Sequence, residues 1–338
     1  MNPTVSVLVP VYNGMPYLPD ALKSVLRQTW SDFEVVVVDD ASTDDSWTTI
    51  LAIADRDTRV RAVRNETNLG LPGALNRGME LSRGKWIARQ DQDDLCDPRR
   101  LERQLAFLRA HADVKLLFSD ARIVDAEGRP RGRRRTVTRP EEARWDLCFR
   151  CNFPHSSAIF ARETALSLGG YRNVHACEDW DLWSRFAEVA EVASLRAPLM
   201  KYRVHERSMM GVENKARLAK SAPFLRGIMR RNFERFACID PDGPAARIMI
   251  DAWVDLPGSG WDAYFAAREE TARDYGAAGS SGFRRLVGEQ DFMLFCRLAG
   301  RGRREAVEFL QRRWHCCPGR RFDFPWVRAA AILAMARG

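Results

Sequence analysis

Hydrophobic residues in the first 125 positions form short runs that alternate with stretches of helical spacing. Val5–Val9 and Phe33–Val38 are almost wholly apolar, as is typical of strands buried on both faces of a helix-covered sheet. Between them, Leu18, Leu22 and Val25 recur four and three residues apart, which predicts an amphipathic helix. The chain therefore opens with a strand, a helix and a second strand.

The same alternation continues to residue 118. The predicted strands are 5–9, 33–38, 60–63, 86–88 and 114–118, and the predicted helices are 17–28, 45–54, 73–81 and 99–109. Strands and helices in strict alternation favour an α/β fold, with a mostly parallel sheet covered by helices on both faces.

After Asp125 the pattern is less regular. Arg129–Arg135 is predicted to be a basic loop, either a solvated turn or a mobile lid that touches an anionic ligand. Ser156–Phe160 is a further predicted strand, and Gly169-Gly170 ends a short helix. From about Val212 the pattern is helical, so we expect one domain over residues 1–210 and a helical domain over 211–338.

Composition and charge narrow the class of protein. The 338 residues are 46% hydrophobic and 29% charged, as expected of a globular protein. No apolar run is long enough for a transmembrane helix, and the strand pattern starts too early for a signal peptide. Eight cysteines without a secretion signal indicate free thiols in a reducing compartment, which predicts a cytoplasmic location.

The net charge of +8 is unevenly distributed. Residues 1–211 carry 31 basic and 30 acidic side chains, whereas 212–338 carry 22 and 15. Near the end, Arg320–Arg328 precedes the apolar stretch Ala329–Ala336. Basic and aromatic residues beside a short apolar helix predict peripheral contact with the inner face of a membrane. The basic helical region could otherwise contact an acceptor or a second copy of the chain.

Acidic residues cluster at the predicted carboxyl ends of strands, where parallel α/β sheets bind ligands. Asp39-Asp40 ends one strand, and Asp91–Asp94 follows another. Carboxylates one residue apart in a loop suit a hard divalent cation. A single such pair is also typical of a capped turn, but two clusters at successive strand ends favour the cation. Glu178-Asp179 is either an acidic first turn of a helix or the source of a general base.

Six motifs in order carry a family resemblance. They are Val7–Asn13, Val36–Asp44, Asn68–Asn76, Arg89–Asp94, Glu178-Asp179 and Tyr202–His205. Together, over residues 3–208, they resemble the GT-A-fold glycosyltransferases of family 2. The resemblance implies a GT-A nucleotide-sugar-binding catalytic domain and inverting transfer of a sugar from a nucleoside-diphosphate sugar.

The resemblance also implies roles for individual residues. It assigns the nucleotide and donor contacts to Pro10, Val11, Tyr12, Asp39, Asp40, Asn68, Asn76 and Asp91, with Asp40 reading the base, usually uracil. It assigns a divalent cation, Mn²⁺ or Mg²⁺, to Asp93, Asp94 and His205, although His205 could instead serve only in packing. Asp179 matches the catalytic base. His155 either lines the acceptor side or packs in the core.

The remaining signals concern partners and alternatives. Processive family members carry Q-x-x-R-W, but Gln311–Trp314 has the wrong spacing, so one sugar per event is expected. The expected partners are a nucleoside-diphosphate sugar, with a UDP-sugar first, and a glycan or lipid-linked glycan acceptor in polysaccharide or cell-envelope biosynthesis. Nucleic acid is not expected. Cys148 and Cys151 lack a second pair for zinc. The alternative is a non-catalytic nucleotide- or glycan-binding scaffold with a basic docking region.

Overall fold

The computed structural model describes residues 2–208, 215–237, 240–254, 263, 264, 266–268 and 271. The chain divides into two compact units, one of residues 1–143 and 151–221 and the other of 144–150 and 222–338. The predicted domain boundary at 210/211 lies within residues 209–214, outside the described residues, and stays a prediction.

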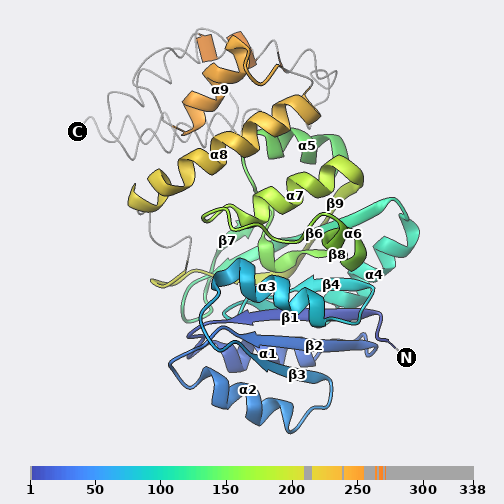
Figure 1. Ribbon diagram of the computed structural model, residues 1–338. Coiled ribbons are helices and arrows are strands. Elements are labelled where there is room, and N and C mark those ends of the chain that lie inside the picture. Colours follow the sequence, from blue (N-terminus) through green and yellow to red (C-terminus); the bar gives the residue numbers. More distant parts are fainter. Residues whose placement is uncertain are drawn as a thin grey trace, which may run out of the picture. The chain divides into compact units, whose positions relative to one another are not determined.

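The first part of the chain alternates strands and helices (Figure 1). In order, they are β1 (Val5–Val11), α1 (Leu18–Leu26), β2 (Phe33–Asp39), α2 (Ser46–Ala54), β3 (Val60–Arg64), α3 (Gly70–Leu81), β4 (Trp86–Arg89), β5 (Leu95–Cys96), α4 (Arg100–Ala110) and β6 (Val114–Val124). The predicted α/β fold is confirmed.

The second part is more varied. It contains β7 (Pro130–Arg134), α5 (Pro140–Phe149), the 3-10 turn η1 (His155–Ser157), β8 (Ile159–Ala161), α6 (Arg162–Ser167), α7 (Glu178–Val189), β9 (Glu191–Arg203), α8 (Lys215–Phe236) and α9 (Pro244–Val254). The helical character expected after residue 212 is seen in α8 and α9, the two long helices described there.

The strands of the first unit form one sheet in the order β3-β2-β1-β4-β8-β6-β9-β5, with β7 paired to β6. Neighbouring strands from β3 to β4 are parallel. The direction changes at β8, which is antiparallel to both β4 and β6, whereas β6 and β9 are parallel again. Parallel strands place their carboxyl ends at one edge, which is where the site lies.

Two local predictions were wrong, and one long strand was missed. Residues 130–134 form strand β7 rather than a loop, because they pair with β6 from Ala121 to Val124. The strand expected over 156–160 is divided into η1 and β8. The long strand β9 was not predicted, and irregular register with β6 near Asp120 interrupts its alternation.

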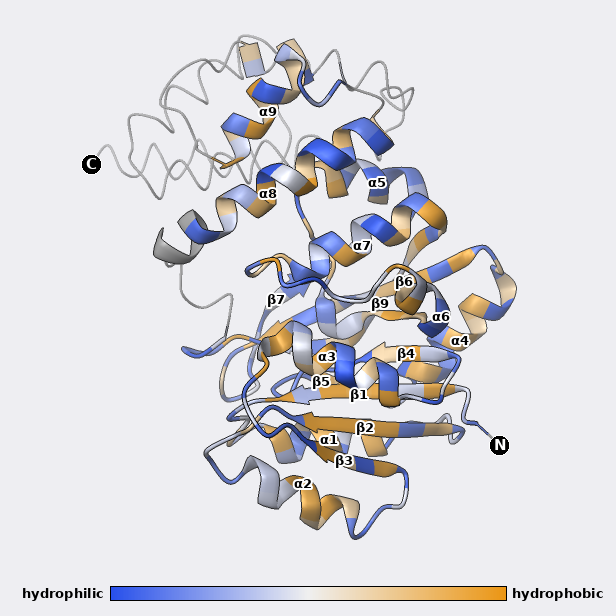
Figure 2. Cartoon of the chain, viewed as in Figure 1, coloured by the Kyte–Doolittle hydropathy of each residue, from blue (hydrophilic) through white to orange (hydrophobic). Residues whose placement is uncertain are grey.

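The burial of the sheet core explains why the strands and helices of the first part of the chain could be predicted from the sequence. Every residue of β1 and β2 is buried, and both strands are orange along most of their length in Figure 2. Leu22 of α1 packs on one face with the odd-numbered valines of β1. Gly78 of α3 lies against Leu8 and Val38 on the other face. Helices therefore cover both faces of the parallel strands.

The second unit has its own aromatic core. The ring of Phe149 lies 5.3 Å from Phe233 and 5.8 Å from Trp253, and the Asn232 side-chain amide donates to the Leu147 carbonyl at 2.7 Å. None of the described helices has both the length and the hydropathy needed to cross a bilayer. The predicted membrane-contact segment and the Gln311–Trp314 motif lie outside the described residues.

Gly84 allows the chain to enter β4 close to the start of β1. A Cβ at this position would lie 2.5 Å from the Ser6 nitrogen and 2.7 Å from the Val5 carbonyl carbon. Because backbone atoms cannot move aside easily, we expect Gly84→Ala to lower the free energy of unfolding by about 1–3 kcal/mol. Urea denaturation followed by circular dichroism measures the change.

Gly132→Ala is the control, since its added Cβ would meet only Ile123 Cδ1 at 3.9 Å. Equal stability of the two variants would contradict the packing of β4 against β1.

Candidate active site

Parallel pairing brings three strand ends together. Val11 lies opposite Asp39, and Leu8 lies opposite Arg89, so the loops that follow β1, β2 and β4 leave the sheet at the same edge. This is the edge at which open α/β sheets bind ligands.

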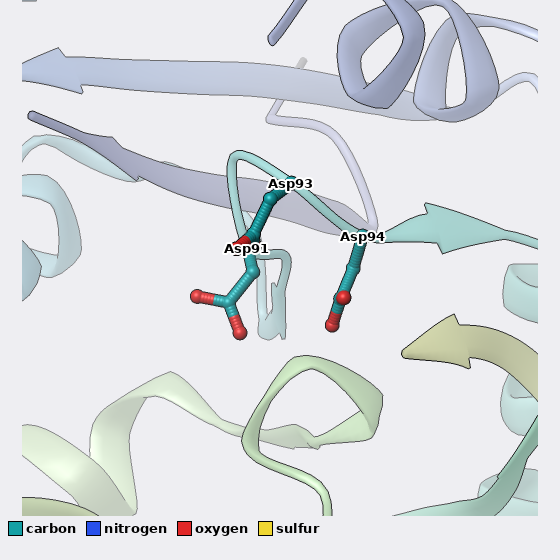
Figure 3. Close-up of side chains that lie close together, drawn as sticks. All are labelled: Asp91, Asp93 and Asp94. Carbon is teal, nitrogen blue, oxygen red and sulfur yellow. The ribbon is translucent and has the colours of Figure 1, made fainter. Parts of the chain in front are cut away.

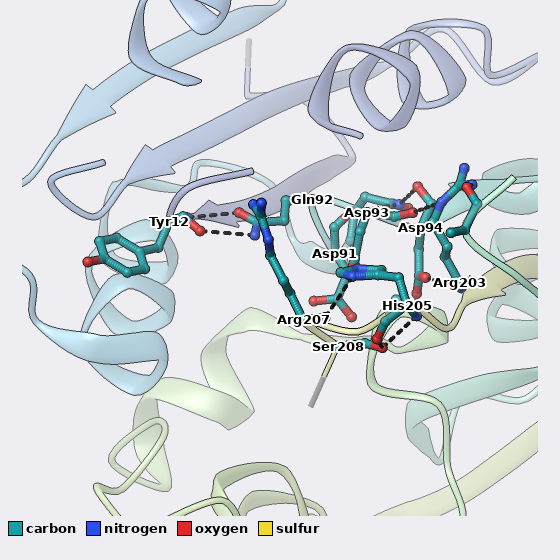
Figure 4. A network of polar contacts seen from close by, with 12 residues as sticks. Tyr12, Asp91, Gln92, Asp93, Asp94, Arg203, His205, Arg207 and Ser208 are labelled. Carbon is teal, nitrogen blue, oxygen red and sulfur yellow. Dashed lines mark hydrogen bonds and ion pairs between the residues drawn. The ribbon is translucent and has the colours of Figure 1, made fainter. Parts of the chain in front are cut away.

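The end of β1 is tied to the loop that follows β4. Pro10 and Val11 are buried strand residues, whereas the side chain of Tyr12 is exposed. The Tyr12 N–H donates to Gln92 Oε1 at 2.8 Å, and Gln92 Nε2 donates to the Tyr12 carbonyl at 3.1 Å (Figure 4). Gln92 therefore fixes the acidic loop to the end of β1. The sequence analysis did not single out Gln92.

Asp91, Asp93 and Asp94 converge in this loop. One carboxylate oxygen from each lies within 4.8 Å of the others (Figure 3). Burial, and after it the charge of Asp91, raises the pKa of Asp93. The same causes, with Asp93 added, raise the pKa of Asp94 well above its usual value. Like charges held together in this way favour a compensating cation.

Two of these carboxylates are already held by the protein. Asp94 is buried; its Oδ1 accepts the Arg203 N–H at 2.8 Å, and its Oδ2 accepts the Ser156 hydroxyl. Asp91 forms an ion pair with Arg89, whose side chain is only 2% exposed. Arg89 belongs to the motif Arg89–Asp94, but the sequence alone suggested no role for it. The signal that could have identified it is an arginine at the end of a buried strand, directly before an acidic run.

Asp93 contacts His205, 112 positions away. His205 Nε2 lies 2.9 Å from Asp93 Oδ2, and the Arg207 N–H donates to Nδ1 at 3.2 Å. Since Nδ1 accepts, Nε2 carries the proton and donates to the carboxylate. The Tyr17 ring lies 4.7 Å from the His205 ring, so an aromatic side chain that sequence reasoning missed helps to orient it.

The donor set fits a hard divalent cation. Three carboxylates supply oxygen ligands, which Mg²⁺ and Mn²⁺ prefer, and His205 holds Asp93 in place through Nε2. The pKa values of Asp93 and Asp94 are raised first by burial and then by the neighbouring carboxylates, so negative charge is costly here and a cation would lower that cost.

Two buried polar atoms at the ends of β2 and β3 have no hydrogen-bond partner among the described residues. Asp39 Oδ2 accepts from the Ser42 N–H at 3.3 Å and pairs with Arg64 at 3.1 Å. Asp40 Oδ1 accepts from Asn65 Nδ2 at 2.7 Å. Within the described residues, Asp39 Oδ1 and Asn65 Oδ1 have no hydrogen-bond partner. Asp40 therefore holds the segment that follows β3, and its predicted contact with the base stays a prediction.

The two predicted asparagines differ in setting. Asn68 is exposed, and its Oδ1 accepts the Gly70 N–H at 3.0 Å. The Asn76 amide pairs with the main chain of Tyr171, donating to its carbonyl and accepting its N–H, each at 2.8 Å. Asn76 therefore holds the segment before α7, and its predicted donor contact stays a prediction.

Asp179 lies in the first turn of α7 and is partly exposed. Its Oδ1 accepts the Trp180 N–H at 2.7 Å, and Cys151 Sγ lies 3.9 Å from its Oδ2. Burial raises the pKa of Asp179, against the opposing Trp180 hydrogen bond and the charges of Arg134 and Arg89. A carboxylate with a raised pKa accepts a proton more readily, as a general base must.

The comparisons with known proteins agree with this geometry. The model for glycosyl transferase family 2 matches residues 6–166. The amylovoran biosynthesis glycosyltransferase AmsE of Erwinia amylovora is 31% identical over 59% of this chain and 75% of its own length. EpsE of Bacillus subtilis is 35% identical over 55% of this chain and 68% of its own.

This chain belongs to glycosyl transferase family 2.

It is therefore a glycosyltransferase, and its Asp91-Asp93-Asp94 cluster fits the DxD motif. TarS of Staphylococcus aureus in complex with UDP-GlcNAc is structurally similar, with a TM-score of 0.60 and 16% identity over 93% of this chain and 91% of that one. A mannosyltransferase from Pyrobaculum calidifontis in complex with GDP-Man and Mn²⁺ gives 0.51 and 20% over 86% and 79%. These likenesses show the GT-A fold.

His155 gives the glycosyltransferase a pH-dependent stability. Burial, and after it the charge of Arg89, lowers the pKa of His155 well below its usual value, and its Nε2 lies 2.9 Å from the Tyr171 hydroxyl. The folded state therefore holds His155 neutral where the unfolded chain is protonated. Stability is full above the unfolded pKa of about 6.5 and falls as the pH drops below it, by up to about 1.4 kcal/mol per unit.

Urea unfolding at several pH values measures this slope. His155→Gln keeps an acceptor for Tyr171 but does not titrate, so its stability should fall less between pH about 6.5 and about 5. Parallel curves for the two proteins would show that His155 is not held neutral.

Proposed function

We propose that this chain is an inverting, metal-dependent glycosyltransferase. It transfers one sugar per event from a nucleoside-diphosphate sugar, first of all a UDP-sugar, to a hydroxyl of a glycan or lipid-linked glycan. Arg89 carries the proposal, because it pairs with Asp91 and its charge also acts on the pKa of Asp179. This shared arginine supports our assignment of the DxD carboxylates and the candidate base to one site.

The proposed donor contacts lie at the strand edge. Tyr12, together with Pro10 and Val11 beneath it, would receive the nucleoside, and Asp39 or Asp40 would accept a base N–H. Donors of similar proteins support a nucleotide sugar: TarS is in complex with UDP-GlcNAc and the Pyrobaculum enzyme with GDP-Man. Since these nucleotides differ, the base is the first thing to test.

Asp93 would hold a divalent cation together with Asp91 and Asp94, while His205 orients Asp93 or, in the tautomer whose Nε2 is unprotonated, joins the ligands. When bound, the cation supplies positive charge that stabilises the diphosphate as it leaves. The complex of the Pyrobaculum enzyme with Mn²⁺ supports this assignment.

The chemistry requires one base. Asp179 would accept the proton of the acceptor hydroxyl as its oxygen attacks the anomeric carbon from the side opposite the diphosphate. The new C–O bond forms while the bond to the diphosphate oxygen breaks, and the electron pair leaves with the nucleoside diphosphate. A single displacement inverts the anomeric centre, through an oxocarbenium-like state. AmsE, named for amylovoran biosynthesis, supports a glycan acceptor.

A donor screen tests the function directly. UDP-, GDP- and dTDP-sugars are mixed with the protein and Mn²⁺ or EDTA, and release of nucleoside diphosphate is counted. We expect release from one donor class, abolished by EDTA and by Asp93→Asn, since that change removes a negative ligand from the cation site. Asp113→Asn, an exposed aspartate away from the site, is the control.

Release that is indifferent to EDTA would refute metal dependence. Absence of release, together with absence of metal-dependent nucleotide binding by calorimetry, would refute the donor site itself.

Asp179→Asn separates chemistry from binding. The amide cannot accept the acceptor proton, so we expect kcat to fall by about 10²–10⁴-fold. The dissociation constant of the donor nucleotide, measured by calorimetry, should stay within about twofold because Asp179 is proposed to touch the acceptor. Glu188→Gln, at an exposed position of the same helix, should retain full activity. An equal loss of donor affinity and rate would remove Asp179 from the role of base.

A further inference from the structure

Arg134 is the last residue of β7, and its side chain holds the segment that precedes η1. Its Nε donates to the carbonyl and to the side-chain Oδ1 of Asn152, each at 3.2 Å, and its Nη2 donates to the Cys151 carbonyl at 3.2 Å. The Asn152 amide donates in return to the Arg135 carbonyl at 3.3 Å. Residues 134 and 135 are therefore fixed to residues 151 and 152.

The segment that Arg134 holds contacts the candidate base. Cys151 Sγ lies 3.9 Å from Asp179 Oδ2, in the first turn of α7. The main chain fixed by Arg134 and the carboxylate are thus connected through a single side chain. A displacement of residues 151 and 152 would move the thiol relative to the base, so Arg134 helps to define the surroundings of Asp179.

Strand alternation places Arg134 on the face of the sheet that carries the site. Arg134 lies opposite Ala121 of β6, and Tyr202 of β9 lies opposite Ile123, two positions further along β6. Residues two apart on a strand face the same side, so Arg134 and Tyr202 share a face. Burial, and after it the charge of Asp91, raises the pKa of Tyr202, whereas Arg134 lowers it. This face is therefore turned toward the acidic loop.

The other two arginines of β7 face the opposite side of the sheet. Arg133 precedes Arg134, and Arg131 lies two positions before Arg133, so alternation turns both away from the site. Arg133 pairs with Asp120 at 3.2 Å and Arg131 with Asp125 at 2.8 Å. Of the arginines of β7, Arg134 is thus the one that faces the site.

The hydrogen bonds of Arg134 leave its positive charge uncompensated. Its acceptors are two main-chain carbonyls and an amide oxygen, all of them neutral. Arg89, which also acts on Asp179, forms an ion pair with Asp91. Of these two arginines, Arg134 is the one that has no carboxylate partner among the residues that the structure describes.

An uncompensated cation matters to a base in this position. Burial raises the pKa of Asp179, whereas the Trp180 N–H bond and the charge of Arg134 lower it. Asp179 accepts a proton only when it is ionised, so a cation that faces it favours the active form. The ionisable groups that face or adjoin Asp179 in the described part of the chain are Arg134 of β7, Arg89 of β4, Cys151 before η1, Tyr171 before α7, and Glu178 of α7 itself.

We propose that Arg134 is a positioning residue for the candidate base, fixing residues 151 and 152 beside Asp179 and facing the carboxylate with a positive charge. This inference rests on the proposed glycosyl transfer and deepens it with a residue outside the six sequence motifs. A guanidinium suits the task because its planar fork donates to several fixed acceptors while it keeps its charge. A lysine would keep the charge but would not reproduce the fork.

The pH dependence of turnover is the readout that a merely structural role would not move. In Arg134→Gln, the acid limb of the kcat profile should move to higher pH, because the base loses a favourable charge. Well below the limb kcat should fall about fivefold, the effect of one partly exposed ion pair, and above the limb it should fall less. Arg134→Lys should keep the limb where it is in the unmodified protein.

A second readout does not depend on catalysis. The full chain, isotope-labelled at the aspartate Cγ, is titrated by NMR, and the Asp179 signal is identified by its loss in Asp179→Asn. The midpoint of this signal should be higher in Arg134→Gln than in the unmodified protein. Arg131→Gln is the matched control, since it removes the same charge from an exposed position on the other face of β7, and it should leave the midpoint unchanged.

The outcomes separate this inference from the proposed function. An Asp179 midpoint that does not move in Arg134→Gln, or a loss of kcat that is equal at every pH, would overturn the inference. A midpoint that moves in a protein that releases no nucleoside diphosphate would refute the glycosyl transfer and support the placement of Arg134.

Discussion

Repulsion between carboxylates at one end of the sheet is the constraint on which the site depends. Asp91, Asp93 and Asp94 approach within 4.8 Å, and burial makes their charges more costly. The protein meets this constraint with fixed donors: Arg89 pairs with Asp91, Arg203 donates its N–H to Asp94, and His205 donates to Asp93. Each donor holds one carboxylate in place, and the remaining negative charge suits a cation and a diphosphate together.

A second buried arginine, Arg100, holds the backbone of Arg89 in place. Arg100 of α4 is buried and donates to the Arg89 carbonyl at 2.9 Å, the Ala158 carbonyl at 3.1 Å and Gln90 Oε1 at 3.2 Å. Burial lowers the pKa of Arg100 to about 10, so it stays charged near neutral pH. It fixes the end of β4 against the segment before β8. The acidic loop therefore starts from a rigid strand end, and Gln92 fixes its middle to Tyr12. Preorganised charge of this kind can act on a reacting group without rearrangement.

Much of the fold could be predicted from the sequence, because strands buried on both faces leave a clear apolar signal. The elements from β1 to α4 were predicted to within a few residues, apart from the short strand β5, which was missed, and family motifs pointed to Asp93 and Asp179. The apolar pattern failed to predict the structure where pairing with a neighbouring strand decides it. The Arg- and Gly-rich segment 130–134 is a strand only because β6 lies beside it. The contacts of Tyr17 with His205 and of His205 with Asp93 join distant positions, which no local pattern encodes.

The central claim is that the acidic loop, held by these donors, binds a divalent cation together with a nucleoside diphosphate. Anomalous diffraction from crystals grown with Mn²⁺ and UDP tests it most directly. The account predicts one anomalous peak within coordination distance of Asp93, with the diphosphate beside it and the nucleoside over the end of β1. A peak elsewhere, or nucleotide bound at this edge with no ion near Asp93, would contradict it.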